Sequence, residues 1–294
     1  GSKEGLANLA SAITSNGDDI IVPNPSYPIH PYGFVIAGAS VSSIDSSPDE
    51  NFLTQLHKTI SSSKNKAKAL VLNYPNNPTT SFASLDFFRE VVNLCLKHSV
   101  YILSDIAYSE IYFNSEPPPS ILQVPKAINI AVEFSSLSKT YSMPGWRIGF
   151  AVGNNKLIAA LAKIKSYLDY GAFTPVQVAG TAALNGPQEC VDEIRSIYLK
   201  RRNLLVEGFN RIGWDMNFPS GTMFVWAPVP KKFNKFGSLE FSKLLLKYGK
   251  VAVAPGIGFG SKGEGFVRIG LVENEYRIRQ AIKNVKIFFD TYDI

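Results

Sequence analysis

The sequence of 294 residues predicts an α/β fold: a mostly parallel central sheet with helices on both faces, followed by a smaller C-terminal α/β domain. Two observations carry this prediction. Short apolar segments alternate with amphipathic helical segments in the first half of the chain, and the alternation changes after residue 185. The composition agrees, because 45% hydrophobic and 18% charged residues suit a globular protein and are too apolar for a disordered one.

In the first half, each predicted strand is a short apolar run between polar residues. Helices are expected at residues 49–60 and 84–99, where apolar residues recur at helical spacing. Such alternation of strands and helices is typical of a parallel sheet with both faces covered. The expected strands are residues 19–24, 41–45, 67–74, 100–108, 127–136 and 146–153.

The second half opens with a long predicted helix. Pro187 stands near its start and Gly213 near its end, where these residue types are favoured. We therefore divide the chain into a large domain, residues 1–186, and a part formed by the long connecting helix and a small C-terminal domain, residues 187–294. The elements expected after the helix are strands at 222–229, 250–255 and 266–272 and helices at 238–249 and 273–289.

Composition and charge argue against several classes of protein. A net charge of +6 would suit nucleic acid, but the basic clusters at residues 64–68 and 200–202 read as solvated faces. No apolar run reaches the roughly 18 residues of a membrane span. Cys95 and Cys190 make no disulfide framework, so a reducing cytoplasm is expected. Cys95 with His98 fits core packing better than a metal site.

Polar residues gather where the predicted strands end. Asn77 follows the third strand, Asp105 and Tyr108 lie at the end of the fourth, and Lys139 follows the fifth. In an open α/β sheet, ligands collect at the carboxyl ends of the strands. We therefore expect these side chains to share one site.

An anion-binding element is expected beside them. Gly1, Ser2 and Lys3 open a predicted helix, whose start offers free N–H groups and the positive end of a dipole to a phosphate. Arg147 could add a bidentate grip on the same phosphate. A lysine amine, a carboxylate and a phosphate site together describe pyridoxal phosphate, which needs all three.

Four segments resemble the signature segments of the class I/II pyridoxal-phosphate aminotransferases, the fold-type-I family. They are "SSLSKTYSMPGWRIGF", "NYPNNPT", "SDIAYSEIYF" and "GSKEGL". The likeness runs along essentially the whole chain. It is greatest to the alanine (glutamate–pyruvate) aminotransferase branch, next to the LL-diaminopimelate and aspartate aminotransferases, through "PNPSYPIHPYGFVIAGA", "KIKSYLDYGAFTPVQVAGTAALNG" and "VAVAPGIGFG".

The resemblance implies a role for each candidate residue. Lys139 would bond to the cofactor aldehyde and move the substrate proton, because the pKa of a lysine falls readily in a buried site. Asp105 would keep the pyridine nitrogen protonated, so that the ring accepts electrons. Asn77 and Tyr108 would hydrogen-bond the phenolic oxygen of the cofactor. Tyr27 would stack on its ring, and Ser2, Lys3, Ser136 and Arg147 would hold its phosphate.

The α-carboxylate of the substrate needs a further cation. In "FVRIGL", Val267 and Ile269 share one strand face, which leaves Arg268 on the other. The pattern alone also fits a surface or salt-bridged arginine on an edge strand; the resemblance implies the arginine that binds the carboxylate, beside Asn77. The glycine-rich run at 255–265 precedes a strand rather than a helix, so it is no dinucleotide loop. We expect a flexible loop near the substrate.

The expected reaction is amino transfer between alanine and 2-oxoglutarate. Transamination of aspartate or LL-diaminopimelate and carbon–sulfur β-elimination stay open, because the same lysine and aspartate serve them all. No second arginine can be assigned to a distal carboxylate, and Thr174 stands where the diaminopimelate enzymes carry an asparagine, so a small neutral substrate is favoured. A non-catalytic regulatory module that binds the cofactor is the rival from another class.

The resemblance also implies a homodimer with its sites at the interface, in which "YLDYGAFTPVQ" faces the partner. Related aminotransferases have a substantial segment before the phosphate-binding motif, which supplies a lid. We therefore expect the 294 residues to be a fragment or the ordered part of a longer protein, and to transaminate poorly alone, since lid closure excludes water.

Overall fold

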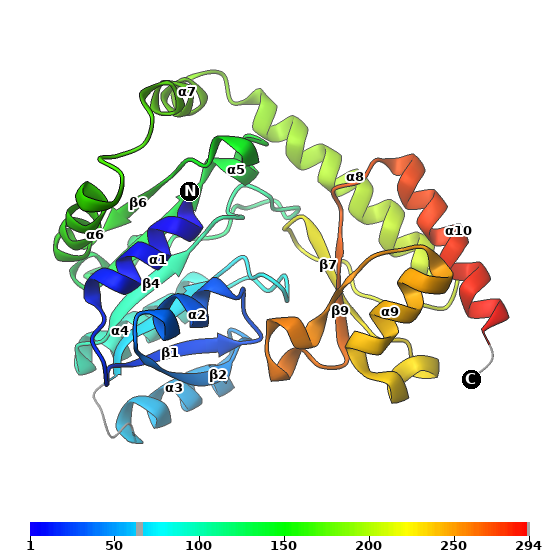
Figure 1. Ribbon diagram of the computed structural model, residues 1–294, viewed down its shortest axis with the longest axis horizontal. Coiled ribbons are helices and arrows are strands. Elements are labelled where there is room, and N and C mark those ends of the chain that lie inside the picture. Colours follow the sequence, from blue (N-terminus) through cyan, green and yellow to red (C-terminus); the bar gives the residue numbers. More distant parts are fainter. Residues whose placement is uncertain (63–66, 293–294) are drawn as a thin grey trace.

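The computed structural model describes residues 1–62 and 67–292, which form two sheets (Figure 1). The larger sheet has six strands in the order β2-β1-β3-β4-β5-β6. Neighbouring strands are parallel except β6, which runs antiparallel to β5, so the prediction of a mostly parallel sheet is confirmed. The strands are β1 (Asp19–Asn24), β2 (Ser40–Asp45), β3 (Ala67–Asn73), β4 (Tyr101–Asp105), β5 (Ala131–Ser136) and β6 (Gly149–Gly153).

Helices cover both faces of this sheet, as predicted. Phe52 and Phe88, from α3 and α4, are buried in the core on one face. Leu6, Phe34 and Leu157, from α1, α2 and α6, are buried in the core on the other. Because both faces are covered, β3 is buried along almost its whole length, which explains its continuous apolar run. The helices are α1 (Ser2–Ile13), α2 (Ile29–Ile36), α3 (Glu50–Ser62), α4 (Leu85–His98) and α6 (Asn155–Leu168).

The smaller sheet is antiparallel, with β9 between β7 and β8. Val267 and Ile269 on β9 face a core formed with α8, α9 and α10, whereas Arg268 lies on the opposite face. Arg268 is thus on a central strand, and not on an edge. The elements are β7 (Phe224–Pro228), β8 (Ala254–Pro255), β9 (Phe266–Gly270), α8 (Glu189–Arg211), α9 (Gly237–Gly249) and α10 (Glu275–Thr291).

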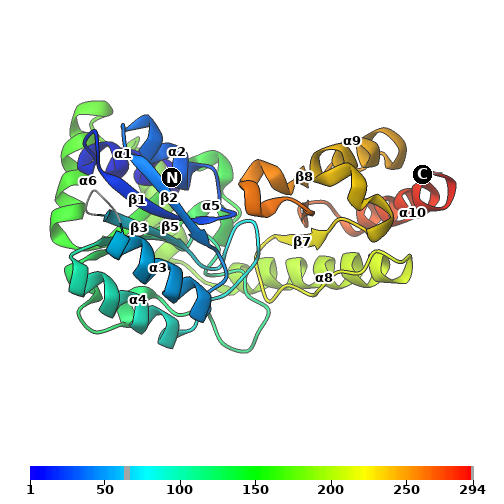
Figure 2. The same cartoon turned by 90° about the horizontal axis from the view of Figure 1, so that it is seen from below.

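Helix α8 runs from the larger sheet to the smaller one (Figure 2). Its basic residues were expected to be solvated, and for two of them this is wrong. Arg201 donates to the carbonyl oxygens of Leu271 and Val272 at 3.2 and 3.1 Å. Arg202 donates to a carbonyl 17 residues later in the chain, and its guanidinium lies over the rings of Phe113 and Phe218. Residues 64 and 66 of the other basic cluster lie outside the described residues.

The glycine-rich run is more regular than the loop that was predicted. It forms two short 3₁₀ helices, η5 (Gly256–Phe259) and η6 (Ser261–Gly263). A Cβ on Gly256 would lie 1.9 Å from the carbonyl oxygen of Gly263, so the two turns approach too closely for a larger residue. The run is also tied to the larger sheet, because the amide of Ser26 donates to the carbonyl of Phe259 at 2.8 Å.

Other differences from the predicted elements are local. The fifth strand begins at Ala131, because a 3₁₀ turn, η2 (Ala127–Asn129), precedes it. The predicted strand at 250–255 is reduced to β8, and the long helix begins at Glu189. Helices α2, α6 and α7 (Thr174–Asn185) were not predicted. The remaining short helices are α5 (Leu137–Thr140), η1 (Ile121–Gln123), η3 (Pro144–Trp146) and η4 (Lys231–Phe236).

The described part of the chain contains no helix that is long and apolar enough to cross a membrane. Nor do its histidine, cysteine and acidic side chains gather in a group of three that could hold a metal. Cys95 is buried in the core, where burial raises the pKa of its thiol to about 12, whereas Cys190 is exposed.

Candidate active site

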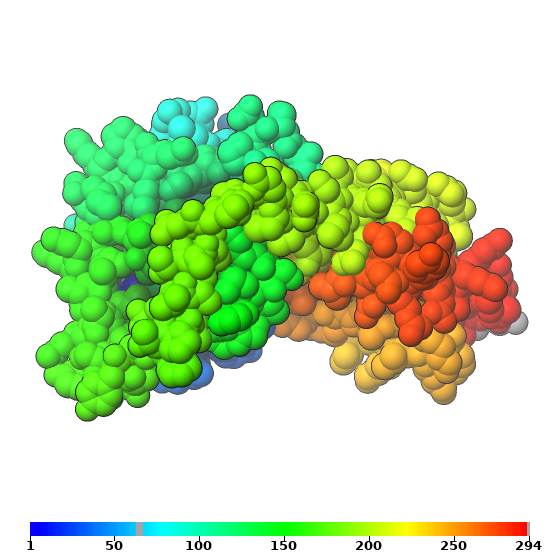
Figure 3. All heavy atoms as spheres, turned by 90° about the horizontal axis from the view of Figure 1, so that it is seen from above, coloured from blue at the N-terminus to red at the C-terminus, as the bar shows by residue number. Residues whose placement is uncertain are grey.

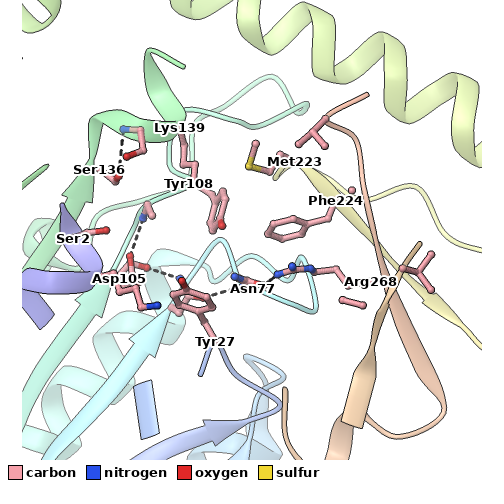
Figure 4. A pocket seen from close by; sticks show the side chains of 18 of the residues that line it. Ser2, Tyr27, Asn77, Asp105, Tyr108, Ser136, Lys139, Met223, Phe224 and Arg268 are labelled. Atoms are coloured by element: carbon pink, nitrogen blue, oxygen red, sulfur yellow. Dashed lines mark hydrogen bonds between the residues drawn. The ribbon is translucent and has the colours of Figure 1, made fainter. Parts of the chain in front are cut away.

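One cavity of about 470 Å³ lies between the carboxyl ends of the central strands and the smaller sheet (Figure 4). Every site residue predicted from the sequence lines it. Asn77, Tyr108, Phe224 and Arg268 face the same space in Figure 4. The predicted residues in the lining are Ser2, Lys3, Tyr27, Asn77, Asp105, Tyr108, Ser136, Lys139, Arg147 and Arg268.

Lys139 reaches the cavity from α5, a single helical turn directly after β5. Ser136, the last residue of β5, caps this turn: its Oγ accepts from the amide of Ser138 at 3.3 Å. Burial lowers the pKa of Lys139, and the nearby cations Arg147 and Arg268 lower it further. A neutral amine is therefore accessible at lower pH than for an exposed lysine, which a nucleophile or base requires.

Asp105 ends β4 and is buried at the floor of the cavity. Its Oδ1 accepts from the amide of Ala107 at 3.1 Å. Its Oδ2 lies 3.1 Å from Nε2 of His30, a buried residue on α2. Sequence reasoning missed His30. The sequence offered one indication of His30: it lies three residues after the predicted site residue Tyr27, at the start of a helix.

Asn73 connects the ends of β3 and β4 and was also missed. Its Nδ2 donates to the carbonyl of Asp105 at 2.7 Å, and its Oδ1 accepts from the amide of Asn77 at 2.8 Å. Asn77, itself buried, then accepts from Nη1 of Arg268 through its Oδ1 at 2.6 Å. A chain of hydrogen bonds therefore runs from the larger sheet to the arginine of the smaller sheet.

Arg268 has a partly buried guanidinium, and no acidic partner is recorded for it among the described residues. Its charged carbon lies 4.8 Å from the ring centre of Phe224 and 4.6 Å from that of Phe259. Burial lowers the pKa of Arg268. A partly buried cation gains from a paired anion, so the N–H groups of this guanidinium that do not contact Asn77 are suited to an incoming carboxylate.

The opposite end of the cavity offers donors for an anion. Ser2 and Lys3 lie in the first turn of α1, and the Nζ of Lys3 is 5.6 Å from the ring centre of Tyr27. Arg147 adds its guanidinium, which donates to the carbonyl of Pro144 at 2.8 Å. Helix start and guanidinium together can hold a phosphate.

The backbone around Arg147 is shaped for this contact. Arg147 has a φ of 51°, a left-handed conformation that costs energy for a residue other than glycine. Two residues later, a Cβ on Gly149 would lie 2.5 Å from the carbonyl oxygen of Ser135 and 3.0 Å from the amide nitrogen of Ser2. Glycine at this position therefore lets α1 begin directly against β6.

The smaller sheet supplies an apolar wall that the sequence did not predict. Met223 and Phe224, with Val253 and Val272, line the cavity on that side. Phe224 packs edge-to-face on Tyr108, with ring centres 5.1 Å apart. Burial raises the pKa of Tyr108, so its hydroxyl stays protonated at neutral pH and can donate a hydrogen bond.

These residues fit pyridoxal phosphate. The cavity places a half-buried amine, a buried carboxylate and a helix start with a nearby guanidinium around one volume, which matches the aldehyde, the ring nitrogen and the phosphate of that cofactor. Fold and cavity thus define a pyridoxal-phosphate enzyme of the mostly parallel α/β class.

The family follows from comparison with known proteins. Residues 1–285 match the family described as aminotransferase class I and II, and the chain therefore belongs to that family, whose members depend on pyridoxal phosphate. AatC of Rhizobium meliloti (strain 1021) is 56% identical over 293 residues, which are 100% of this chain and 72% of that protein.

Two further comparisons agree. The protein is 50% identical over 289 residues to the glutamate-pyruvate aminotransferase AlaC of Escherichia coli (strain K12), covering 98% of this chain and 70% of AlaC. Among solved structures, the apo form of BacF from Bacillus subtilis superposes with a TM-score of 0.92 at 34% identity, over 98% of this chain and 76% of that one.

Proposed function

We propose that the protein transfers the amino group of alanine to 2-oxoglutarate, giving pyruvate and glutamate. The observation that carries the proposal is the meeting of Lys139, Asp105 and Arg268 in one cavity, because amino transfer needs a base, an electron sink and a carboxylate grip. The likeness to AlaC supports the choice of substrates.

When bound, pyridoxal phosphate supplies the aldehyde that takes up the amino group and a ring that accepts electrons from the α-carbon. Lys139 would hold the cofactor aldehyde and would move the proton of the α-carbon. Asp105 would pair with the pyridine nitrogen and favour its protonated form. Tyr27 would stack on the ring, and Asn77 and Tyr108 would donate to the phenolic oxygen.

In this proposal, the cofactor phosphate and the substrate carboxylate are bound by separate groups of residues. Ser2, Lys3, Ser136 and Arg147 bind the phosphate, and Arg268 binds the α-carboxylate of amino and oxo acids alike. Arg147 and Arg268 are the arginines among the described lining residues, so the side chain of the substrate meets no third guanidinium.

We also propose that the protein acts as a homodimer, with residues 167–177 facing the partner. Supporting this, the segment carries several apolar side chains that are exposed to solvent, as surfaces that bind a partner commonly do. Figure 3 looks onto the face that α6 and α7 form. The exposed fractions are 72% for Tyr167, 60% for Leu168, 97% for Tyr170 and 74% for Phe173.

The division at residues 186 and 187 and a reducing cytoplasm belong to the same proposal. Separate cores support the division: two lie before that boundary, on the faces of the larger sheet, and one lies after it. The two cysteines are both free, which suits a reducing compartment.

A substrate panel tests the proposed function. The purified protein is loaded with pyridoxal phosphate and mixed with alanine, aspartate, LL-diaminopimelate or cystathionine, and the visible absorbance of the cofactor is followed. The proposal expects alanine to give the fastest change, with pyruvate released and no ammonia. Faster reaction with aspartate or LL-diaminopimelate, or ammonia from cystathionine, would assign one of the other reactions that the same lysine and aspartate can serve.

A further inference from the structure

The guanidinium of Arg268 lies between two aromatic rings. Its central carbon is 4.8 Å from the ring centre of Phe224 and 4.6 Å from that of Phe259. Phe224 belongs to β7 and lines the cavity, whereas Phe259 comes from η5, the turn between β8 and β9. Rings on a guanidinium attract its charge and leave its N–H groups free in their own plane.

On its other side, Phe259 packs against Trp226 of the smaller sheet. Trp226 on β7 pairs directly with Arg268 on β9, so the two side chains stand on the same face. The ring of Trp226 meets that of Phe259 edge-to-face, with centres 5.9 Å apart, and stacks on Phe266 at 5.3 Å. Phe259 is therefore held between Trp226 and the guanidinium.

The backbone of Phe259 is fixed to the larger sheet. Its carbonyl accepts from the amide of Ser26 at 2.8 Å, one residue before Tyr27. Asn24 secures the following turn, donating to Oγ of Ser261 at 3.1 Å and accepting from the amide of Lys262 at 3.2 Å. The Nζ of Lys262 pairs with Asp45 at 2.9 Å. One short turn thus connects the carboxylate-binding arginine to the segment that carries Tyr27.

We propose that Phe259 is a positioning residue for Arg268, and this rests on the proposed function of Arg268 as the carboxylate grip. The ring restricts the guanidinium to the plane in which Nη1 donates to Asn77, so the remaining N–H groups point to a carboxylate in the cavity. Phe259 itself is not among the residues that line the cavity. The hydrogen bond from the amide of Ser26 to the carbonyl of Phe259 keeps the plane of the guanidinium fixed relative to the segment that carries Tyr27.

Three variants test the inference. Phe259→Leu keeps apolar bulk and removes the ring, Phe259→Tyr keeps the ring, and Phe266→Leu makes the same change at a ring that stacks on Trp226. We expect Phe259→Leu to raise KM for alanine and 2-oxoglutarate together by roughly five- to thirty-fold, the range for a desolvated cation–π contact. The kcat should change by less than about two-fold, because the lost contact stabilises the bound substrate and the transition state equally. Phe259→Tyr should restore KM, and Phe266→Leu should leave it unchanged.

A second measurement needs no enzymatic activity. Phenylglyoxal modifies accessible arginines, and peptide mass spectrometry gives its rate at Arg268 in the cofactor-loaded protein. The rate should rise in Phe259→Leu and stay at the wild-type value in Phe259→Tyr and Phe266→Leu. Equal rates in all variants would overturn the inference, as would an unchanged KM in an active Phe259→Leu enzyme. A wild-type protein without transfer from any amino acid would refute the proposed function instead.

Discussion

Nε2 of His30 lies 3.1 Å from Oδ2 of Asp105, and both side chains are buried. With the ring hydrogen of His30 on Nε2, this contact is a hydrogen bond donated to the carboxylate. Oδ1 of the same carboxylate accepts from the amide of Ala107. The orientation of Asp105 is therefore fixed from two sides, before any ring nitrogen faces it.

This contact predicts that His30→Phe slows amino transfer and spares cofactor binding. Phenylalanine keeps a buried ring but donates no hydrogen bond. Loss of a hydrogen bond to a charged group should lower kcat by roughly 10- to 100-fold. His30→Gln, which keeps a donor, should recover part of the rate, whereas Asp105→Asn should be slower than either. His57→Phe, the same change at an exposed histidine, is the control. An unchanged kcat in His30→Phe would show that the contact serves folding alone.

Lys139→Ala should abolish the covalent link to the cofactor and keep its noncovalent binding, because the phosphate and ring contacts remain. The measurement is borohydride reduction of the loaded protein followed by peptide mapping. The wild type should carry the pyridoxyl group on Lys139 and the variant on no peptide. Lys97→Ala, on the surface of α4, should behave as the wild type. A reduced adduct on another lysine would contradict the assignment.

Arg268→Lys should raise KM for amino and oxo acids alike, because both present an α-carboxylate. A lysine cannot make the planar two-point contact, and the loss is about 2–3 kcal/mol, or roughly 30- to 150-fold in KM. Steady-state kinetics with each substrate varied in turn gives both values. If KM rose for one class of substrate only, Arg268 would recognise a side chain rather than the common carboxylate.

The pH dependence of Lys139 is a further expected outcome. Burial lowers its pKa, with Arg147 and Arg268 adding to the effect, so the amine loses its proton at lower pH than an exposed lysine does. Acylation of Lys139 in the cofactor-free protein should therefore begin at lower pH than that of the exposed Lys97. Arg268→Met removes one cation and should move the onset for Lys139 to higher pH. Mass spectrometry across a pH series gives both curves; coincident curves for the two lysines would contradict the prediction.

Much of the site could be predicted because its residues follow a rule of strand order. Asp105 ends a central strand, and Asn77 and Lys139 follow its two neighbours within four residues; the carboxyl ends of these strands meet at one edge. Arg268 could be placed by alternation, since apolar residues on both sides of it share the core face of β9. Such local patterns can be recognised in the sequence because they follow from backbone geometry alone.

What could not be predicted depends on contacts between distant segments. His30 meets Asp105 across 75 residues of chain, from a helix whose Pro31 and Gly33 are poor helix formers. Arg202 lies in a helix that looks solvated by its charges, yet it is covered by Phe113 and Phe218 from two loops. Phe259 could not be recognised because it lies in a glycine-rich run. The conformation of that run depends on the close approach of two turns, and it has no periodic pattern of the kind that marks a strand or helix.

The split of the cavity between two sheets has a consequence for selectivity. Asp105 ends a strand of the larger sheet, Lys139 lies on the helical turn that follows another of its strands, and Arg268 belongs to the smaller sheet. In the proposed function, an amino acid bridges them with its amine at one sheet and its carboxylate at the other. A simple amine of the same size has nothing to offer the arginine, so it would be held at one end only and lose the orientation that proton removal needs. Discrimination between amino acids and plain amines would then be built into the architecture, ahead of any pocket for the side chain.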